Sequence, residues 1–178
     1  MNRREVLRWL GGAALAPLTP LSARDRLALG RRVHQLTSQA GGALSPAQVA
    51  FVSALSDSIL PRTDTPGALD VEVPAFIDRF LAGWYAPADR TNLLAGIDAL
   101  EEECRRSHGR PFAQLDAAER GAFLGTVDGK EGPPRSPAWG YRRVHELVVF
   151  GYTTSKPVAE LLRDMPVIPG RFDGCVPV

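Results

Sequence analysis

Ser45-Pro46-Ala47-Gln48 begins the stretch that decides the fold, and Pro61 ends it. Ser45 can cap a helix, Pro46 suits the first helical position, and Gln48 can close a capping box. After this start, apolar residues recur at spacings of three, three and four, at Val49, Val52, Leu55 and Ile59. This spacing places them on one helical face, so the stretch predicts a helix that packs against a core.

Similar signals recur along most of the chain, and alternating apolar and polar runs of useful length are missing. Gly41-Gly42, Pro87 and Gly109 interrupt the periodic stretches, as helix breakers do. We expect Asp89 to cap one long helix and Asp116 to begin a capping box in the next. Helices are expected at 24–40, from Ser45, from Val73-Pro74, from Asp89 to Gly109, from Asp116, at 139–152 and, for one or two turns, at 158–162. The fold predicted is all-α, an irregular bundle of about six helices with a long extended C-terminal tail.

The amino terminus has the three-part layout of an export signal. Arg3 and Arg4, followed by Leu7, form a charged head of the twin-arginine type, and a weakly apolar run follows it. This run is roughly ten residues long, whereas a helix needs roughly 20 to cross a bilayer. We therefore assign residues 1–23 to a twin-arginine export signal and residues 24–178 to a single helical domain. A basic terminus that stays in the cytosol is the alternative, and cleavage after Ala23 or retention as an anchor stays open.

The charge balance argues against nucleic acid as a partner. The full chain has 21 basic and 20 acidic residues, which gives a formal net charge of +1. Without the predicted signal, which holds Arg3, Arg4, Arg8 and Glu5, the formal charge of the remaining domain becomes −1. A domain that binds a phosphate backbone has an excess of basic residues, so we expect no nucleic-acid binding.

Residues that could carry chemistry are scattered rather than grouped. His34, His108 and His145 lie on different predicted elements, and none has the spacing of a metal motif. Cys104 lies on the apolar face of its helix and is expected in the core. The charged residues 101–106 fit a solvated helix face with local ion pairs better than an acid–base pair. The sequence therefore predicts no metal site, no cofactor site and no catalytic residues in this chain.

Two stretches are more apolar than an ordinary surface. Trp84 and Tyr85 place large aromatic side chains at the end of a predicted helix. The segment at about 150–178 carries aromatic residues, prolines and glycines without a helical period. Residues of this kind either cover the chain's own core or bind another protein, and for the first part of the tail both interpretations stay open. For residues 171–177 a partner surface is favoured. The partner-binding residues predicted are Trp84, Tyr85, Tyr152, Arg171, Phe172 and Cys175.

Several of these motifs together resemble the gluconate 2-dehydrogenase subunit 3 family. The resemblance covers most of the domain after the signal, and its loop and tail motifs are more specific than the helices between them. Ser155-Lys156-Pro157 departs from the family pattern, which has an acidic residue after the serine. The residues that carry the resemblance are the twin-arginine start, Ile59-Leu60-Pro61-Arg62-Thr63-Asp64-Thr65-Pro66-Gly67-Ala68, Val73-Pro74-Ala75-Phe76-Ile77-Asp78, Gly151-Tyr152-Thr153-Thr154-Ser155 and Pro169-Gly170-Arg171-Phe172-Asp173-Gly174-Cys175.

This resemblance implies a non-catalytic small subunit of a periplasmic FAD-dependent sugar or sugar-acid dehydrogenase. In that family the catalytic partner is a GMC-type flavoprotein that holds FAD, and a multihaem cytochrome c subunit often passes electrons to the membrane. The small subunit brings the export signal to the twin-arginine translocase and supports maturation of the flavoprotein. We therefore expect a periplasmic protein that is exported folded and is associated with the inner membrane through its complex.

The resemblance also implies that Cys175 could join this subunit covalently to its partner. A disulfide between Cys175 and Cys104, or an unpaired Cys175, are the alternatives. Two other functions stay open. The chain could be an independent periplasmic helical ligand-binding protein or enzyme, or a membrane-tethered assembly factor that leaves after maturation.

Overall fold

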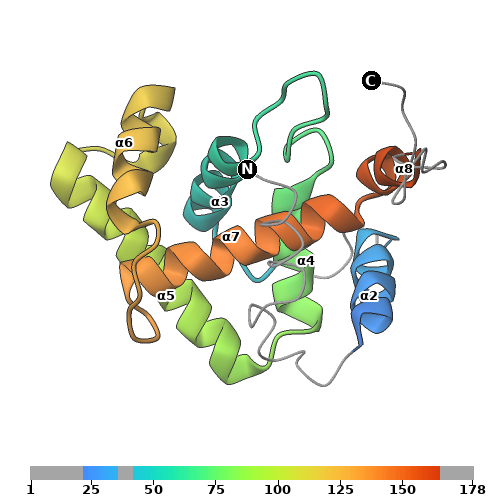
Figure 1. Ribbon diagram of the computed structural model, residues 1–178. Coiled ribbons are helices and arrows are strands. Elements are labelled where there is room, and N and C mark those ends of the chain that lie inside the picture. Colours follow the sequence, from blue (N-terminus) through green and yellow to red (C-terminus); the bar gives the residue numbers. More distant parts are fainter. Residues whose placement is uncertain (1–21, 36–41, 165–178) are drawn as a thin grey trace, which may run out of the picture.

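The computed structural model describes residues 22–35 and 42–164, and this part of the chain is all-helical (Figure 1). It contains seven α-helices, one short 3-10 helix and no strand. The all-α prediction is confirmed. The one or two helical turns expected at 158–162 belong to a longer helix that begins at Lys156. Of the extended tail expected at about 150–178, residues 150–154 and 156–164 are helical instead, and the part after residue 164 lies outside the described residues. The elements are α2 (Ala23–Gln35), α3 (Pro46–Ile59), α4 (Val73–Gly83), α5 (Pro87–His108), η2 (Phe112–Gln114), α6 (Ala117–Val127), α7 (Pro137–Thr154) and α8 (Lys156–Asp164).

Helix α3 begins as its sequence predicts. The backbone N–H of Gln48 donates to Ser45 Oγ (3.3 Å), and the backbone N–H of Ser45 donates to Gln48 Oε1 (3.0 Å). These two bonds form the capping box and satisfy amides that the helix leaves unpaired. The predicted inner face needs one correction, because Val49 is 38% exposed. Phe51 takes its place in the core beside Val52 and Leu55.

The other helix boundaries follow from local capping chemistry, with one correction. Asp89 does not cap α5, because Ala86 is the N-cap, Pro87 is the first helical residue and Asp89 lies in the first turn. Gly109 ends α5 with φ of 73°, a left-handed conformation that glycine adopts without strain. Asp116 and Glu119 form the expected capping box of α6. No helix in the described part of the chain combines the length and apolar character needed to span a membrane.

Helix α7 runs through the middle of the bundle, and the other helices pack around it (Figure 1). Its buried side chains lie on several sides of the helix, among them Tyr141, Val144, Leu147 and Phe150. Its tightest neighbour is α5, and the crossing is made by two glycines. A Cβ atom placed on Gly140 would lie 2.4 Å from the backbone oxygen of Gly96. The two backbones therefore touch, and the crossing has no room for a larger residue at Gly140.

Two groups of aromatic rings contribute to the core. Phe76 and Phe80 stack on each other, and each meets Phe150 of α7 edge-on. Phe112 packs between Phe51 and Phe123 in the second group. Rings at these separations contribute about 0.5–1.5 kcal/mol per pair beyond their buried area. The first group comes from α4 and the last turns of α7, and His34 of α2 stacks on its Phe76 ring. This group therefore helps to fix the position of the candidate site.

Residues 150–155 belong to this core. They form the last turn of α7 and its C-cap rather than an irregular tail, and Phe150, Gly151, Thr154 and Ser155 are buried. The question left open for the first part of the tail is thereby answered in favour of the chain's own bundle. The sequence obscured the helix because glycine and threonine interrupt its apolar period.

Candidate functional site

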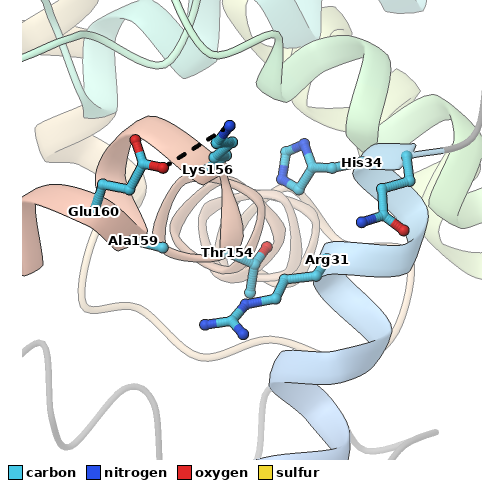
Figure 2. A pocket seen from close by; sticks show the side chains of 7 residues that line it. Arg31, His34, Thr154, Lys156, Ala159 and Glu160 are labelled. Carbon is cyan, nitrogen blue, oxygen red and sulfur yellow. Dashed lines mark ion pairs between the residues drawn. The ribbon is translucent and has the colours of Figure 1, made fainter. Parts of the chain in front are cut away.

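A pocket opens between α2, the end of α7 and the start of α8, with a volume of about 430 Å³. We call it the α2–α8 pocket. Figure 2 shows its side chains arranged around the end of α7, with α2 on one side and α8 on the other. Its polar lining residues are Arg31, His34, Gln35, Thr154, Lys156 and Glu160, and Ala159 completes the wall.

Two contacts hold α2 against α7 and fix one wall of this pocket. The Nε2 atom of His34 lies 2.8 Å from the carbonyl oxygen of Gly151. Because a carbonyl oxygen only accepts, Nε2 carries the proton and donates it. Four residues earlier on α2, Gly30 sits directly against Thr154, since a Cβ atom placed on Gly30 would lie 2.5 Å from the Thr154 side chain. This second contact lies about one helical turn from the first, and the two contacts together fix this wall of the pocket.

The imidazole of His34 is further held by a ring stack. Its centroid lies 4.5 Å from that of Phe76, and the two planes are inclined by 29°. Burial lowers the pKa of His34 from its ordinary value, the hydrogen bond to Gly151 acts in the opposite direction, and nearby Arg79 lowers it further. We therefore assign the neutral imidazole at pH 7, with its proton on Nε2.

The charged residues of the pocket are exposed and mostly basic. Arg31 forms no ion pair with any residue in the described ranges. Lys156 Nζ lies 3.9 Å from Glu160 Oε1, and these side chains are 86% and 55% exposed. An ion pair this long and this exposed contributes little to stability. The rim of the pocket therefore carries two cationic groups and one carboxylate.

A second exposed feature is the loop between α3 and α4, residues 60–72, which we call the 60–72 loop. Its backbone is closed by a bond from the Ala68 N–H to the Leu60 carbonyl (2.9 Å). Asp70 holds it from inside, accepting from the Gly67 N–H (2.8 Å) and from Arg62 (3.1 Å). A Cβ atom placed on Gly67 would lie 2.6 Å from the Arg62 nitrogen, so the loop requires glycine here. The loop is ordered by its own bonds although most of its residues are exposed.

Tyr152 of α7 anchors the 60–72 loop to the bundle. Its hydroxyl donates to the carbonyl oxygen of Pro66 at 2.7 Å. At the end of the loop, Glu72 has φ of 54° and is the N-cap of α4. A non-glycine residue in this conformation stores strain that the surrounding contacts must offset. The loop thus presents a fixed backbone, with Leu69 47% exposed at its surface.

The predicted partner-binding residues have different environments. Trp84 is half-buried and stacks on Phe80, with ring centroids 6.5 Å apart. Tyr85 is only 9% exposed, and its burial raises the pKa of its hydroxyl to about 12. Tyr152 is half-buried, and its hydroxyl donates a hydrogen bond to the Pro66 carbonyl oxygen. These three side chains therefore pack mainly on their own bundle, and their role toward a partner stays a prediction.

The remaining predicted site residues lie outside the described part of the chain. They are Arg3, Arg4 and Leu7 of the predicted signal, and Arg171, Phe172 and Cys175 of the predicted tail. Cys104 is fully buried, as expected, and burial raises the pKa of its thiol to about 11. Because Cys175 lies outside the described residues, its disulfide to a partner and the alternative disulfide to Cys104 both stay predictions.

The sequence did not indicate the α2–α8 pocket. His34 and Gly151 are separated by 117 positions, and neither lies in a motif that would pair them. The only local signal was that α2 places a glycine and a valine, Gly30 and Val33, on its buried side. Within residues 22–35 and 42–164, no group of three or more His, Cys, Asp or Glu side chains could hold a metal ion.

A comparison with family models matches residues 46–170 to gluconate 2-dehydrogenase subunit 3. The chain belongs to this family. The matched range runs from the first residue of α3 past the end of α8, and it includes the 60–72 loop and Tyr152. Searches of curated proteins and of solved structures gave no match.

Membership of the gluconate 2-dehydrogenase subunit 3 family indicates an accessory subunit of a multi-subunit dehydrogenase. The 60–72 loop lies wholly inside the matched range. The α2–α8 pocket lies partly inside it, because Arg31, His34 and Gln35 come before the range and Thr154, Lys156, Ala159 and Glu160 lie within it.

Proposed function

We propose that this chain is the non-catalytic small subunit of a periplasmic FAD-dependent sugar or sugar-acid dehydrogenase. In this role it carries the folded GMC-type flavoprotein through the twin-arginine pathway and stabilises it. The family match over residues 46–170 is the observation that carries the proposal. The Arg3-Arg4 pair supports the export step, because a signal of this type serves proteins that cross the membrane already folded.

The 60–72 loop supports a docking role toward the flavoprotein. A binding surface that is ordered before contact loses less conformational entropy on association. The bonds from Asp70 to Gly67 and from Tyr152 to Pro66 provide this order. Leu69 is an exposed apolar side chain on the same loop and is suited to a small apolar depression on a partner.

In this proposal FAD is held by the flavoprotein, and a multihaem cytochrome c is a third subunit where one is present. The small subunit contributes a folded helical surface and an export signal. It needs no residue that touches the sugar, and substrate specificity lies in the flavoprotein.

The test follows both subunits during export. The chain is co-expressed with a GMC-type FAD-binding protein that lacks an export signal of its own, and each is quantified in cytosol and periplasm. We expect Arg3→Lys combined with Arg4→Lys to leave both proteins in the cytosol, whereas Arg8→Lys, outside the pair, serves as the matched control. If the flavoprotein still reaches the periplasm when the doubly substituted chain does not, the escort role is wrong.

The same experiment separates the alternatives. An independent ligand-binding protein or enzyme would be exported alone, and deletion of this chain would leave the flavoprotein's location unchanged. An assembly factor that leaves after maturation would be required for export but absent from the purified mature dehydrogenase. We expect the chain to remain in that complex.

A further inference from the structure

We propose that the α2–α8 pocket is a binding site for a small organic dicarboxylate. The site goes beyond the accessory role proposed above. Of its charged residues, Arg31 lies before the range matched by the family, and Lys156 and Glu160 lie inside that range. The proposal is carried by the shape of the pocket, the residues that fix it and the charges at its rim.

The pocket has the size and rigidity of a small-molecule site. Its volume of about 430 Å³ lies in the range of about 300–1,000 Å³ that is usual for ligand pockets. His34 is held by Gly151 and by the Phe76 ring, and Gly30 is packed against Thr154. The walls on α2 and α7 therefore stay in place without a ligand, and binding need not order them.

The floor of the pocket is polar but already paired within the chain. The hydroxyl of Thr154 is buried and donates to the Phe150 carbonyl (2.8 Å), which leaves its oxygen lone pairs as acceptors. The Nε2 proton of His34 is used by Gly151. The floor therefore offers little to an anion, and an anionic ligand must be held by groups at the rim.

The rim supplies two cations from different helices. Figure 2 shows Arg31 and Lys156 at opposite edges of the opening, with Thr154 between them. Arg31 has no carboxylate partner among the described residues, and Lys156 has only a long contact to Glu160. A guanidinium binds a carboxylate through two parallel hydrogen bonds, and an ammonium binds one as a point charge. Two separated cations across one opening fit a ligand with a carboxylate at each end.

Glu160 is the element of the pocket that opposes such a ligand. Its carboxylate competes for Lys156 and repels an incoming anion. Removing the Glu160 charge should therefore strengthen ligand binding. Damage to the fold would weaken binding instead, so the two effects can be told apart.

The experiment measures binding to the full-length chain by isothermal titration calorimetry at low ionic strength. The probes are succinate, its uncharged counterpart succinamide, and the monocarboxylate propionate. We expect saturable binding of succinate, weaker binding of propionate and no measurable binding of succinamide. Added salt should weaken the succinate affinity, because both cations are exposed to solvent.

Four variants locate the site. Arg31→Gln and Lys156→Gln should each weaken succinate binding by about fivefold, because each removes one charge-assisted contact at an exposed position. Glu160→Gln should tighten binding by about threefold. Arg32→Gln, an exposed arginine on α2 outside the pocket lining, is the matched control and should leave the affinity unchanged.

A second measurement does not depend on affinity alone. The pKa of His34, followed by NMR, should rise when succinate is bound, because a nearby negative charge favours the imidazolium. The proposal is overturned if succinate gives no saturable binding, if succinamide binds equally well, or if Arg32→Gln weakens binding as much as Arg31→Gln. Loss of binding in Glu160→Gln would overturn it as well.

Discussion

The hydroxyl of Tyr152 donates a hydrogen bond to the carbonyl oxygen of Pro66, joining α7 to a loop 86 positions earlier in the chain. The bond fixes the exposed 60–72 loop to the helix at the centre of the bundle. It also explains why a tyrosine that looks like a surface residue in the sequence is half-buried in the fold.

Replacing Tyr152 by phenylalanine should therefore loosen the loop. We expect Tyr152→Phe to lower the free energy of unfolding by about 1 kcal/mol, since it removes one hydrogen bond and leaves the Pro66 carbonyl without that donor. Urea unfolding measures the loss, and hydrogen exchange should locate it in residues 60–72. Tyr141→Phe is the control, because the Tyr141 hydroxyl makes no hydrogen bond to a described residue. Equal losses in both variants would contradict the role given to Tyr152.

The glycine crossing of α5 and α7 gives a pair of substitutions with opposite effects. Gly140→Ala should destabilise the protein by about 1–3 kcal/mol, because its Cβ would meet the Gly96 backbone. Gly121→Ala in α6 should stabilise it by about 0.5–1 kcal/mol, since nothing lies within 4 Å of the added carbon and helical glycine is entropically unfavourable. Thermal or urea unfolding measures both. A neutral Gly140→Ala would show that the helices do not touch here.

The lowered pKa of His34 predicts a dependence of stability on pH. Because the folded-state pKa is below the ordinary value of 6.5, the unfolded chain binds the proton first as pH falls. The contribution of neutral, buried His34 to the free energy of unfolding is complete above pH 6.5. It is lost as the pH falls from there through the lowered folded-state pKa of His34. The charged groups near His34 are Arg79 and Glu72 together with Arg31, Lys156 and Glu160 of the pocket.

The measurement compares the free energy of unfolding of the wild type and His34→Gln between about pH 5 and pH 7.5. The wild type should lose more stability on acidification than the variant does. His145, whose pKa burial also lowers, and Glu146, whose pKa burial raises, are present in both proteins, so the difference isolates His34. His108→Gln is the matched histidine control. Parallel curves for wild type and His34→Gln would refute the assignment.

Cys104 should be unreactive in the folded protein. It is fully buried and burial raises the pKa of its thiol to about 11, so little thiolate is present at pH 8. In the Cys175→Ser variant we expect no reaction with a thiol reagent until denaturant is added, and then one thiol per chain. Rapid labelling of the folded variant would contradict the buried position.

Leu69 tests the docking role of the 60–72 loop. Leu69→Glu should reduce recovery of the flavoprotein with this chain about tenfold, since a charge would be buried against an apolar contact. Val49→Glu on α3 is the matched control, because Val49 is an apolar residue of similar exposure. Both variants should keep the wild-type unfolding midpoint. Undiminished recovery with Leu69→Glu would remove the loop from the interface.

The sequence predicted the helices well where the end signals are local. The boxes at Ser45 and Asp116, the start at Val73 and the stop at Gly109 each depend on residues within one or two turns. Asp89 was assigned wrongly because both proline and aspartate favour a helix start, and Pro87 takes the first position. The prediction that Val49 is buried was wrong. The helical period shows which residues share a face, but it does not show how far along that face the core extends.

The candidate site was beyond local reasoning. The contact of His34 with Gly151 and that of Tyr152 with Pro66 join segments far apart in the chain. The packing of α2 on α7 creates the first contact, and the packing of the 60–72 loop on α7 creates the second. Trp84 and Tyr85 illustrate the same limit. Their large side chains indicated that both residues contact other apolar groups. The sequence does not distinguish a ring that packs on Phe80 of its own chain from a ring that binds another protein.

Helix α7, around which the other helices pack, follows α3, α4 and α5 in the chain. The ribosome therefore makes those three helices before it makes the segment that buries their inner faces. Until residues 137–154 have left the exit tunnel, the apolar faces that α7 covers stay open to solvent or to chaperones. The core therefore closes only after the last turn of α7 has been synthesised, and any quality control that inspects the packed bundle must act after that point.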